Sequence, residues 1–347
     1  MDMQNTTNDI TLSCRVRLAR NILGLPFVSK LPKEKASENV NKVYNALKNF
    51  SLGGQAGGSQ ECNNFLLYRM SDMDLLDTKV LQEKRLISED LALNKASGAA
   101  IIDESEQVSI MVNEEDHLRL QSFESGLDLY KAYHRLSKID AYLGKVIGYS
   151  VSPRLGHLTS CVTNVGTGMR AGALLFLPGL GMSRTIEKTI SLASNFQISI
   201  RGFFGEGSEN DGYFYQISNQ RTLGLTEKEI LDSVTSVIAH LVQAEQSARH
   251  GIYSANQVVL KDKVLRAYGI VTNAYCLSSK ELMEYLALVK LGHSLDILRL
   301  DDVKKLDKLI EECQPAQITA IGDGLYDPIE RDVYRARLVA KSIKRVG

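Results

Sequence analysis

Apolar residues recur at helical spacing in three long segments of the chain. In residues 33–50 and 127–143 the apolar side chains fall on one side, which predicts two amphipathic helices. A third helix is expected to start at Thr226, which can form a capping box with Glu229, and to end near Gly251.

Short β-like runs lie between these helices. They cover residues 11–19, 99–102, 108–112, 173–177 and 197–204. Their mixture with long helices predicts an α+β fold. The Gly- and Ser-rich residues 51–59 are typical of a loop.

The pattern changes after residue 254. Helix starts are predicted at Ser278, at Asp301 or Asp302, and at Asp327, where an N-cap Asp is followed by Pro and then Glu. We therefore expect two domains, an α+β domain over residues 10–254 and a small helical domain over residues 255–347.

Charge and cysteine content argue against several protein classes. The 347 residues contain 41 Lys plus Arg and 41 Asp plus Glu, so no global field attracts nucleic acid or an anionic membrane. No apolar run approaches the ~18 residues that span a bilayer, and residues 1–9 lack the order of a secretory signal. Five scattered cysteines without a C-x-x-C pair favour a reducing cytoplasm over a disulfide framework or a zinc site. The six histidines show no metal-ligand spacing either.

Two arginines share one face of the first β-like run. Leu12, Cys14, Val16 and Leu18 alternate there with Ser13, Arg15 and Arg17. Guanidiniums so placed repel one another unless an anion lies between them, which indicates a phosphate site. A solvent-facing strand edge is the alternative.

Carboxylates and arginines recur together at two other places. Glu114, Glu115 and Asp116 precede Arg119, and Arg201 precedes Glu206 in a glycine-rich stretch. A solvated turn is one interpretation of the acidic run. The other is a carboxylate that holds a cation, with an arginine turned toward an anion.

The segment around Cys161 allows three interpretations. Gly166, Gly168 and Ala171 satisfy the G-x-G-x-x-A pattern of a dinucleotide fold, but polar residues precede them where that motif needs a buried strand. Cys161 is either a buried structural thiol or, with hydroxyl residues, an Asn and Arg170 nearby, a reactive thiolate. Arginines without a P-loop indicate a triphosphate neutralised by guanidiniums, and paired glutamates indicate a cationic second substrate.

Four segments are distinctive when taken together. They are Ser-Cys-Arg-Val-Arg-Leu-Ala-Arg-Asn from Ser13, Asn-Glu-Glu-Asp-His-Leu-Arg from Asn113, Leu-Thr-Ser-Cys-Val-Thr-Asn-Val-Gly-Thr-Gly-Met-Arg from Leu158, and Arg-Gly-Phe-Phe-Gly-Glu-Gly-Ser-Glu from Arg201. In this order they resemble the guanidino (phosphagen) kinases. Within that superfamily the chain is most similar, over nearly its whole length, to the bacterial protein arginine kinases of the McsB type.

Two features favour the protein kinases over the small-molecule enzymes. The first motif begins at residue 13, without the helical N-terminal domain of those enzymes. Near the end, Arg331-Asp332-Val333-Tyr334-Arg335-Ala336 matches the family's R-D-x-x-R-A motif. The resemblance implies an antiparallel sheet flanked by helices, followed by a small helical domain. It also implies ATP-dependent phosphorylation of protein arginine on a guanidino nitrogen, with Mg²⁺ on the nucleotide and no metal site of the protein's own.

The resemblance also implies roles for individual residues. Glu115 and Glu206 would clamp the substrate guanidinium, with Glu115 as the base, and Cys161 would be the thiolate beside it. The implied ATP site comprises Ser13, Cys14, Arg15, Val16, Arg17, Arg85, Arg119, Arg170, Ala171, Gly172, Ala173, Leu174, Arg201, Gly202, Phe203, Phe204, Gly205 and Glu206. An allosteric phosphoarginine site would comprise Arg331, Asp332, Arg335 and Ala336; from the residues alone, a basic surface helix is the alternative.

The partners implied by the resemblance are proteins. They are arginine-bearing substrates that include a stress-gene repressor, a Clp-type ATPase and protease, an activator protein, and a second copy of the chain that pairs through the helical domain. No direct contact with nucleic acid or membrane is expected.

The chain departs from the family pattern at three positions. Arg85 stands where the family usually has His, Val162 replaces the Pro after the reactive Cys, and Cys14 replaces a common Ser. None removes a charged catalytic group, so we expect activity. The rivals are a kinase for free arginine or another small guanidine, and a phosphoarginine-binding adaptor with weakened catalysis. A dinucleotide-dependent dehydrogenase is the most distant.

Overall fold

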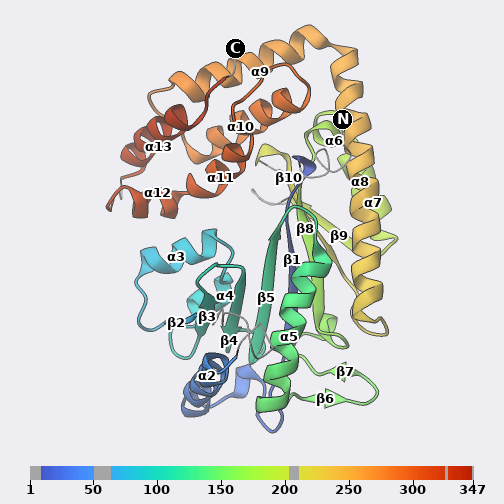
Figure 1. Ribbon diagram of the computed structural model, residues 1–347, viewed down its shortest axis with the longest axis vertical. Helices are drawn as coiled ribbons and strands as arrows, with labels where there is room; N and C mark the ends of the chain where they lie inside the picture. Colours follow the sequence, from blue (N-terminus) through green and yellow to red (C-terminus); the bar gives the residue numbers. More distant parts are fainter. Residues whose placement is uncertain (1–8, 51–63, 203–210, 325–326, 346–347) are drawn as a thin grey trace, which may run out of the picture. The chain divides into compact units, whose positions relative to one another are not determined.

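The computed structural model describes residues 9–50, 64–202, 211–324 and 327–345 (Figure 1). The predicted loop at residues 51–59 lies outside this range. The chain folds into two compact units that interleave along the sequence. The sheet unit comprises Ser13–Ala173 and Ser218–Ser236, and the helical unit comprises Met1–Leu12, Leu174–Ile217 and Val237–Gly347. The expected domain division at residues 254 and 255 stays a prediction.

An eight-stranded sheet has the strand order β2-β3-β4-β5-β1-β8-β10-β9. Its strands are β1 (Thr11–Arg20), β2 (Phe65–Arg69), β3 (Ala99–Asp103), β4 (Val108–Val112), β5 (Leu118–Ser125), β8 (Met169–Phe176), β9 (Ile198–Gly202) and β10 (Phe214–Asn219). The pairs β2–β3, β3–β4, β4–β5 and β5–β1 are antiparallel. The predicted α+β fold is therefore confirmed, and a two-stranded ribbon of β6 (Val151–Ser152) and β7 (Gly156–His157) is added to it.

Helix α5 (Leu129–Ile147) packs on β5 through one apolar stripe (Figure 1). Leu129, Leu136, Ile139 and Leu143 are among its buried residues, at the spacing that brings side chains to one face. The helix begins where the Asp128 side chain accepts the backbone N–H of Lys131. The other helices of the sheet unit are α2 (Lys33–Lys48), α3 (Leu75–Glu83) and α4 (Glu89–Leu93). The predicted helices at residues 33–50 and 127–143 are thus confirmed.

The helical unit holds most of the remaining helices around a separate apolar core. Its α-helices are α6 (Pro178–Met182), α7 (Ile186–Ser194), most of α8 (Glu227–Ala255), α9 (Gln257–Asn273), α10 (Ser279–Ser294), α11 (Lys304–Glu312), α12 (Pro315–Ile321) and α13 (Pro328–Ser342). No helix among the described residues is both long and apolar enough to cross a membrane.

Capping chemistry sets most of the helix starts that the sequence predicts. Thr226 and Glu229 exchange hydrogen bonds at the start of α8, and Ser278 and Glu281 form a full capping box before α10. Asp327 accepts two backbone N–H groups at the start of α13. These three predictions are confirmed, although α8 continues to Ala255 rather than ending near Gly251.

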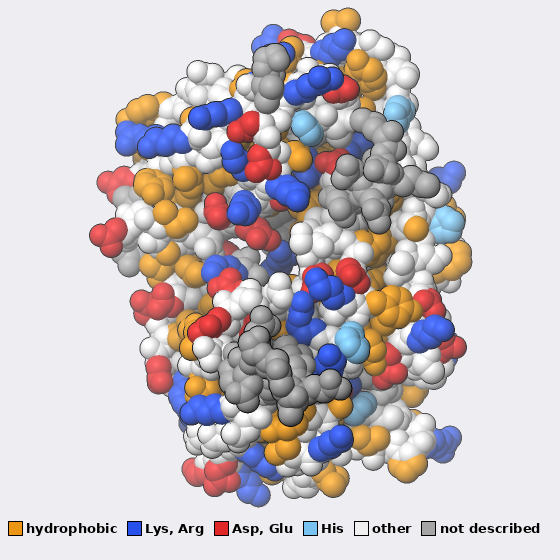
Figure 2. All heavy atoms as spheres, viewed as in Figure 1, with side chains coloured by type: hydrophobic (Ala, Val, Ile, Leu, Met, Phe, Trp, Pro, Cys, Tyr) orange, Lys and Arg blue, Asp and Glu red, His pale blue; other side chains and the backbone are white. Residues whose placement is uncertain are grey.

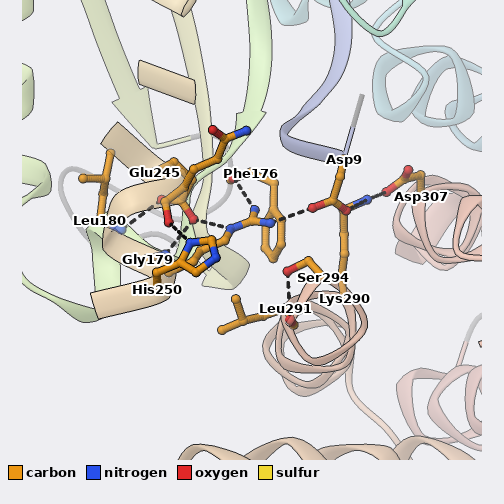
Figure 3. A network of polar contacts seen from close by, with 12 residues as sticks. Asp9, Phe176, Gly179, Leu180, Glu245, His250, Lys290, Leu291, Ser294 and Asp307 are labelled. Atoms are coloured by element: carbon orange, nitrogen blue, oxygen red, sulfur yellow. Dashed lines mark hydrogen bonds and ion pairs between the residues drawn. The ribbon is translucent and has the colours of Figure 1, made fainter. Parts of the chain in front are cut away.

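A chain of alternating charges, three of them buried, runs through the helical unit (Figure 3). Glu245 accepts a hydrogen bond from Arg249 Nε at 2.7 Å, and Arg249 Nη1 lies 2.6 Å from Asp9 Oδ2. Lys290 Nζ lies 3.7 Å from Asp9 Oδ1 and 2.7 Å from Asp307 Oδ1. The four ion pairs link residue 9 to α8, α10 and α11. We refer to these five residues as the charge chain.

Candidate active site

A cavity of about 140 Å³ opens within the sheet unit. Its lining comes from the end of β1, the turn between β4 and β5, the turn around Cys161 and the start of β8. The lining residues are Arg17, Ala19, Glu115, Asp116, Arg119, Cys161, Thr163, Asn164, Gly168 and Arg170. The structure thus brings together five residues that the sequence selected: Arg17, Glu115, Arg119, Cys161 and Arg170.

The predicted alternation along β1 is confirmed. Cys14 and Val16 are 1% and 0% exposed, whereas Arg15 and Arg17 lie on the less buried face. Burial raises the pKa of the Cys14 thiol to about 12, so the thiol is neutral. The side chains of Cys14 and Val16 are turned into the core, so any contact of these two residues with ATP would use their backbone, and the predicted contacts stay predictions.

Like charges are crowded on this face of β1. Burial, and then the charges of Arg85, Arg119 and Arg170, lower the pKa of Arg15 to about 9. The pKa of Arg17 is likewise lowered well below its usual value by burial and by its arginine neighbours. Guanidiniums held this close destabilise one another until a polyanion binds between them.

Arg85 joins this cluster from the connection between α3 and α4. Its Nη1 lies 3.4 Å from the Ser13 hydroxyl, and its backbone has the left-handed conformation, with φ 62°. Arg85 therefore brings a cation close to Ser13 and Arg15, at the position where the family pattern has His.

Two carboxylates of the turn between β4 and β5, those of Glu114 and Glu115, differ in exposure and in their partners. Glu114 is buried and forms an ion pair with Arg119, and it also accepts the Ser88 hydroxyl. Glu115 is exposed at the cavity, and burial followed by the charges of Asp116 and Glu114 raises the pKa of its carboxyl. Glu115 is therefore the carboxylate of this turn that is available to a ligand, with a raised proton affinity that suits a base.

Cys161 lies at the cavity on a turn that leads into a short 3-10 helix at Val162–Asn164. The side chain is partly exposed, and Sγ is 3.0 Å from the Thr163 hydroxyl. Val162, in place of the family's Pro, is 81% exposed and leaves this helix intact. Of the two interpretations of this thiol, the structure rules out the fully buried one.

The start of β8 contributes one residue to the cavity. Arg170 lines it, whereas Ala171, Ala173 and Leu174 are at most 4% exposed. Gly172 is also buried, and the Ala171 N–H already donates to the Asn219 side chain at 2.8 Å. Of residues 170–174, Arg170 lines the cavity, and the predicted ATP contacts of Ala171, Gly172, Ala173 and Leu174 stay predictions.

The glycine pattern at this turn is unrelated to dinucleotide binding. Gly166 and Gly168 lead into a strand of the sheet rather than from a buried strand into a helix. Gly168 has φ +62°, and a Cβ there would lie 2.6 Å from the Ala19 carbonyl oxygen. Glycine is needed because the turn runs against β1.

Part of the predicted site belongs to the helical unit or lies outside the described residues. Arg201 and Gly202 end β9 in the helical unit, where Arg201 is exposed. Phe203, Phe204, Gly205 and Glu206 lie outside the described residues. Their contributions to nucleotide and guanidinium binding stay predictions.

Two residues of the C-terminal motif, Arg335 and Ala336, are buried in the fold. Arg335 is 1% exposed; its Nε donates to the Cys313 carbonyl at 2.9 Å and its Nη1 to the Leu277 carbonyl at 2.8 Å. It also forms an ion pair with Asp332. Ala336 is buried and Arg331 is partly exposed. A purely surface helix is thus excluded for Arg335, and phosphoarginine binding stays a prediction.

Sequence reasoning missed the residues that shape the cavity without carrying its main charges. Ala19, Thr163, Asn164 and Gly168 lie inside the selected motifs, so their adjacency to Arg17, Cys161 and Arg170 was the available signal. The sequence did not distinguish Asp116 from the adjacent Glu114 and Glu115. Its burial and its contact with the Cys161 turn depend on tertiary structure.

Two family models match successive parts of the chain. The ATP:guanido phosphotransferase C-terminal catalytic domain matches residues 30–248, and the protein-arginine kinase McsB C-terminal domain matches residues 257–347. The first match covers more than half of the sequence, and its chemistry agrees with a cavity that combines arginines, a carboxylate and a thiol. The chain belongs to the ATP:guanido phosphotransferase family.

Curated relatives place it more narrowly. A protein-arginine kinase from Caldanaerobacter subterraneus subsp. tengcongensis is 39% identical over 337 residues, covering 97% of this chain and 98% of the relative. A protein-arginine kinase from Bacillus subtilis is 36% identical over 343 residues, covering 99% and 92%. The chain is thus a phosphotransferase of the protein-arginine kinase branch, as its motifs predicted.

Solved structures support the same fold. The substrate-free duplicated taurocyamine kinase from Schistosoma mansoni aligns with a TM-score of 0.58 at 29% identity, covering 71% of this chain and 34% of that one. Lombricine kinase aligns with a TM-score of 0.59 at 24% identity, covering 70% and 68%. The second likeness concerns the fold alone.

Proposed function

We propose that the protein transfers the γ-phosphoryl group of ATP to a guanidino nitrogen of arginine side chains in proteins. The observation that carries this proposal is the cavity in the sheet unit, where Arg17, Arg119 and Arg170 meet the exposed Glu115 and the Cys161 thiol. Similarity to protein-arginine kinases over almost the whole chain supports protein arginine as the acceptor.

The arginine cluster would bind the nucleotide phosphates. Arg15 and Arg17 have pKa values lowered by burial and mutual repulsion, and a bound triphosphate relieves that repulsion. This donor set fits ATP, since charge neutralisation and in-line placement are the main demands of phosphoryl transfer. Mg²⁺ would arrive on the phosphates and neutralise part of their charge. Among the described residues, no group of three acidic, His or Cys side chains forms a cage for it.

Glu115 would orient the acceptor and take its proton. A guanidino nitrogen attacks the γ-phosphorus, a P–N bond forms, and the bond to the ADP oxygen breaks. The attacking nitrogen loses a proton to the Glu115 carboxylate, whose raised pKa makes it a stronger base than an ordinary Glu. We propose that Cys161 lies beside the guanidinium and that Glu206 holds the guanidinium together with Glu115. Arg201 would complete the phosphate site.

The helical C-terminal part would carry regulation and assembly. We propose that residues 10–254 form the catalytic domain and residues 255–347 a domain that binds phosphoarginine and pairs with a second copy. The two family matches, at residues 30–248 and 257–347, support this division. Arg331, Asp332, Arg335 and Ala336 would form the phosphoarginine site, with Arg331 as its most accessible cation.

The cellular role is proposed from similarity to the protein-arginine kinases. The enzyme would act in the cytoplasm on stress-damaged proteins and on a stress-gene repressor, and would mark them for a Clp-type ATPase and protease, with an activator protein. Positive and negative side chains are interspersed on the face in Figure 2, which agrees with protein partners rather than nucleic acid.

The deciding experiment offers the purified chain two acceptors with Mg-ATP, an unfolded arginine-rich protein and free arginine. Products are located by mass spectrometry under conditions that preserve the acid-labile P–N bond. Phosphate on protein arginine, lost in Glu115→Gln, is expected. Phosphate on free arginine alone would assign the small-guanidine kinase instead. Transfer to neither acceptor, with phosphoarginine still bound, would assign the adaptor.

A further inference from the structure

One carboxylate oxygen connects the two turns that present Glu115 and Cys161. Asp116 is 2% exposed and directly follows Glu115. Its Oδ1 accepts the backbone N–H of Ser160 at 2.6 Å and the side-chain amide of Asn21 at 2.5 Å. Ser160 directly precedes Cys161. The residue after the proposed base therefore holds the residue before the thiol, across 44 positions of the sequence.

Asn21 strengthens this connection from the end of β1. Its Nδ2 also donates to the Leu158 carbonyl at 3.0 Å, and its Oδ1 accepts the His117 N–H at 2.9 Å. The side chain thus binds both turns, while its backbone carbonyl accepts the Ser150 N–H. We call the side chains of Asn21 and Asp116 together the clamp.

The far side of the Cys161 turn is anchored separately. The buried Thr222 hydroxyl lies 2.9 Å from the Thr163 carbonyl oxygen and 2.7 Å from that of Val165. Between these two anchors the Cys161 thiol contacts the Thr163 hydroxyl at 3.0 Å. The clamp therefore controls one of two fixed points that set where the thiol lies in the cavity.

We infer that Asp116 is a positioning residue, which holds the Cys161 thiol and the Glu115 carboxylate in register by accepting the Ser160 N–H. This inference rests on the roles proposed above for Glu115 and Cys161. A carboxylate suits the task because an ionised acceptor binds two donors more strongly than a neutral one. Its loss leaves the Ser160 N–H without its acceptor and frees the turn.

The experiment compares three variants in the full chain. Asp116→Ala removes the acceptor, and Asp116→Asn keeps a carbonyl oxygen of the same shape without the charge. Asp103→Ala is the matched control, because Asp103 is also buried and also accepts a backbone N–H, that of Val108 at 2.6 Å, on the β3–β4 hairpin. Each variant is measured for kcat, for KM of ATP and for thermal unfolding.

Cys161 reactivity gives a readout that needs no turnover. Iodoacetamide labelling is followed by mass spectrometry at the Cys161 peptide, with the exposed Cys276 as internal reference. Losing one hydrogen bond raises the opened population of a turn about tenfold, so the Asp116→Ala chain should label about tenfold faster at Cys161. Its kcat should fall about 100-fold, the effect of a 1 Å misplacement, with KM for ATP nearly unchanged.

The outcomes separate positioning from its rivals. The inference is supported if Asp116→Asn recovers most of the kcat and the slow labelling of Cys161. It also requires that Asp103→Ala stay close to the wild type in kcat and in the labelling rate. If Asp116→Asn is as damaged as Asp116→Ala while Cys161 labels at the wild-type rate, the charge acts on substrate directly and the inference is wrong. Equal losses in Asp103→Ala mean general destabilisation and also overturn it. A wild-type chain without transfer activity would refute the proposed function, while the labelling comparison still tests the clamp.

Discussion

Replacing Arg335 by Ala should destabilise the helical unit far more than any exposed arginine of the same helix. The side chain is 1% exposed and donates from Nε and Nη1 to the carbonyls of Cys313 and Leu277, both in buried residues. It ties α13 to the end of α11 and to the residue before the N-cap of α10. Its ion pair with Asp332 is lost at the same time.

The size of the effect follows from these contacts. A buried acceptor left without its donor costs about 1–3 kcal/mol, so the two carbonyls together cost about 2–6 kcal/mol. The unpaired Asp332 adds to this value, and water entering the space left by the side chain reduces it. We expect a loss of about 3–5 kcal/mol, in the range measured for broken buried pairs.

The assay is urea unfolding followed by circular dichroism, with Arg337→Ala as the control. Arg337 lies two residues further along α13 and is exposed, so its loss should stay within about 0.5 kcal/mol. Arg335→Met, which keeps the volume but not the donors, should resemble Arg335→Ala. An Arg335→Ala chain within about 1 kcal/mol of the control would show that these hydrogen bonds do not hold α13.

Three further predictions concern the cavity. Burial and neighbouring carboxylates raise the pKa of Glu115, and a base acts only when it is ionised. On acidification kcat should therefore fall at a higher pH than for an ordinary Glu, whose pKa is 4.5. An acidic limb of the pH–kcat profile at that ordinary value would exclude Glu115 as the base. Arg15→Met should weaken ATP binding about 10–100-fold, measured by calorimetry. The ligand-free variant should be at least as stable as the wild type, because the substitution removes one of several cations that repel one another. A clear loss of ligand-free stability would contradict this argument. Gly168→Ala should lower the unfolding temperature more than Gly24→Ala. Both glycines have a positive φ, but of the two only Gly168 would place its new Cβ against backbone, 2.6 Å from the Ala19 carbonyl oxygen. Equal shifts in unfolding temperature would mean that the strain of the positive φ alone matters.

Local signals predicted the fold best where one short segment determines the result. The start of α13 is fixed by Asp327, whose side chain caps the helix that Pro328 begins, so the sequence alone sufficed. The prediction for α11 was less accurate. Asp302 accepts the N–H of Lys304, but Val303 is the N-cap, so neither predicted Asp is the capping residue.

Strands made of mixed residues were not predicted. β5 (Leu118–Ser125) is central to the sheet, yet Gln121 and Ser122 interrupt its apolar pattern. Both are at most 1% exposed, and Gln121 donates to the carbonyls of Arg85 and Leu86. A buried polar residue is acceptable only when distant partners satisfy it, and those partners are invisible in a window of local sequence.

The same reason limits what could be predicted of the site. Charged residues proposed to meet phosphate or guanidinium, such as Arg17 and Glu115, could be selected from residue type and alternation. Asp116 could not be distinguished from its acidic neighbours, because its partners Ser160 and Asn21 are far away in sequence. Motifs therefore selected the residues proposed to react, whereas the residues proposed to hold them in place could be found only in the structure.

The charge chain has a practical consequence for work with this protein. Asp9 stands close to where the chain begins, and its carboxylate lies between the cations of Arg249 and Lys290, which are 4% and 1% exposed. A shortened expression product that starts after residue 9 would leave these two buried cations with less negative charge between them, and proteolytic trimming would do the same. Trimming of the first ten residues should therefore be checked by intact mass before any loss of stability is attributed to a substitution elsewhere.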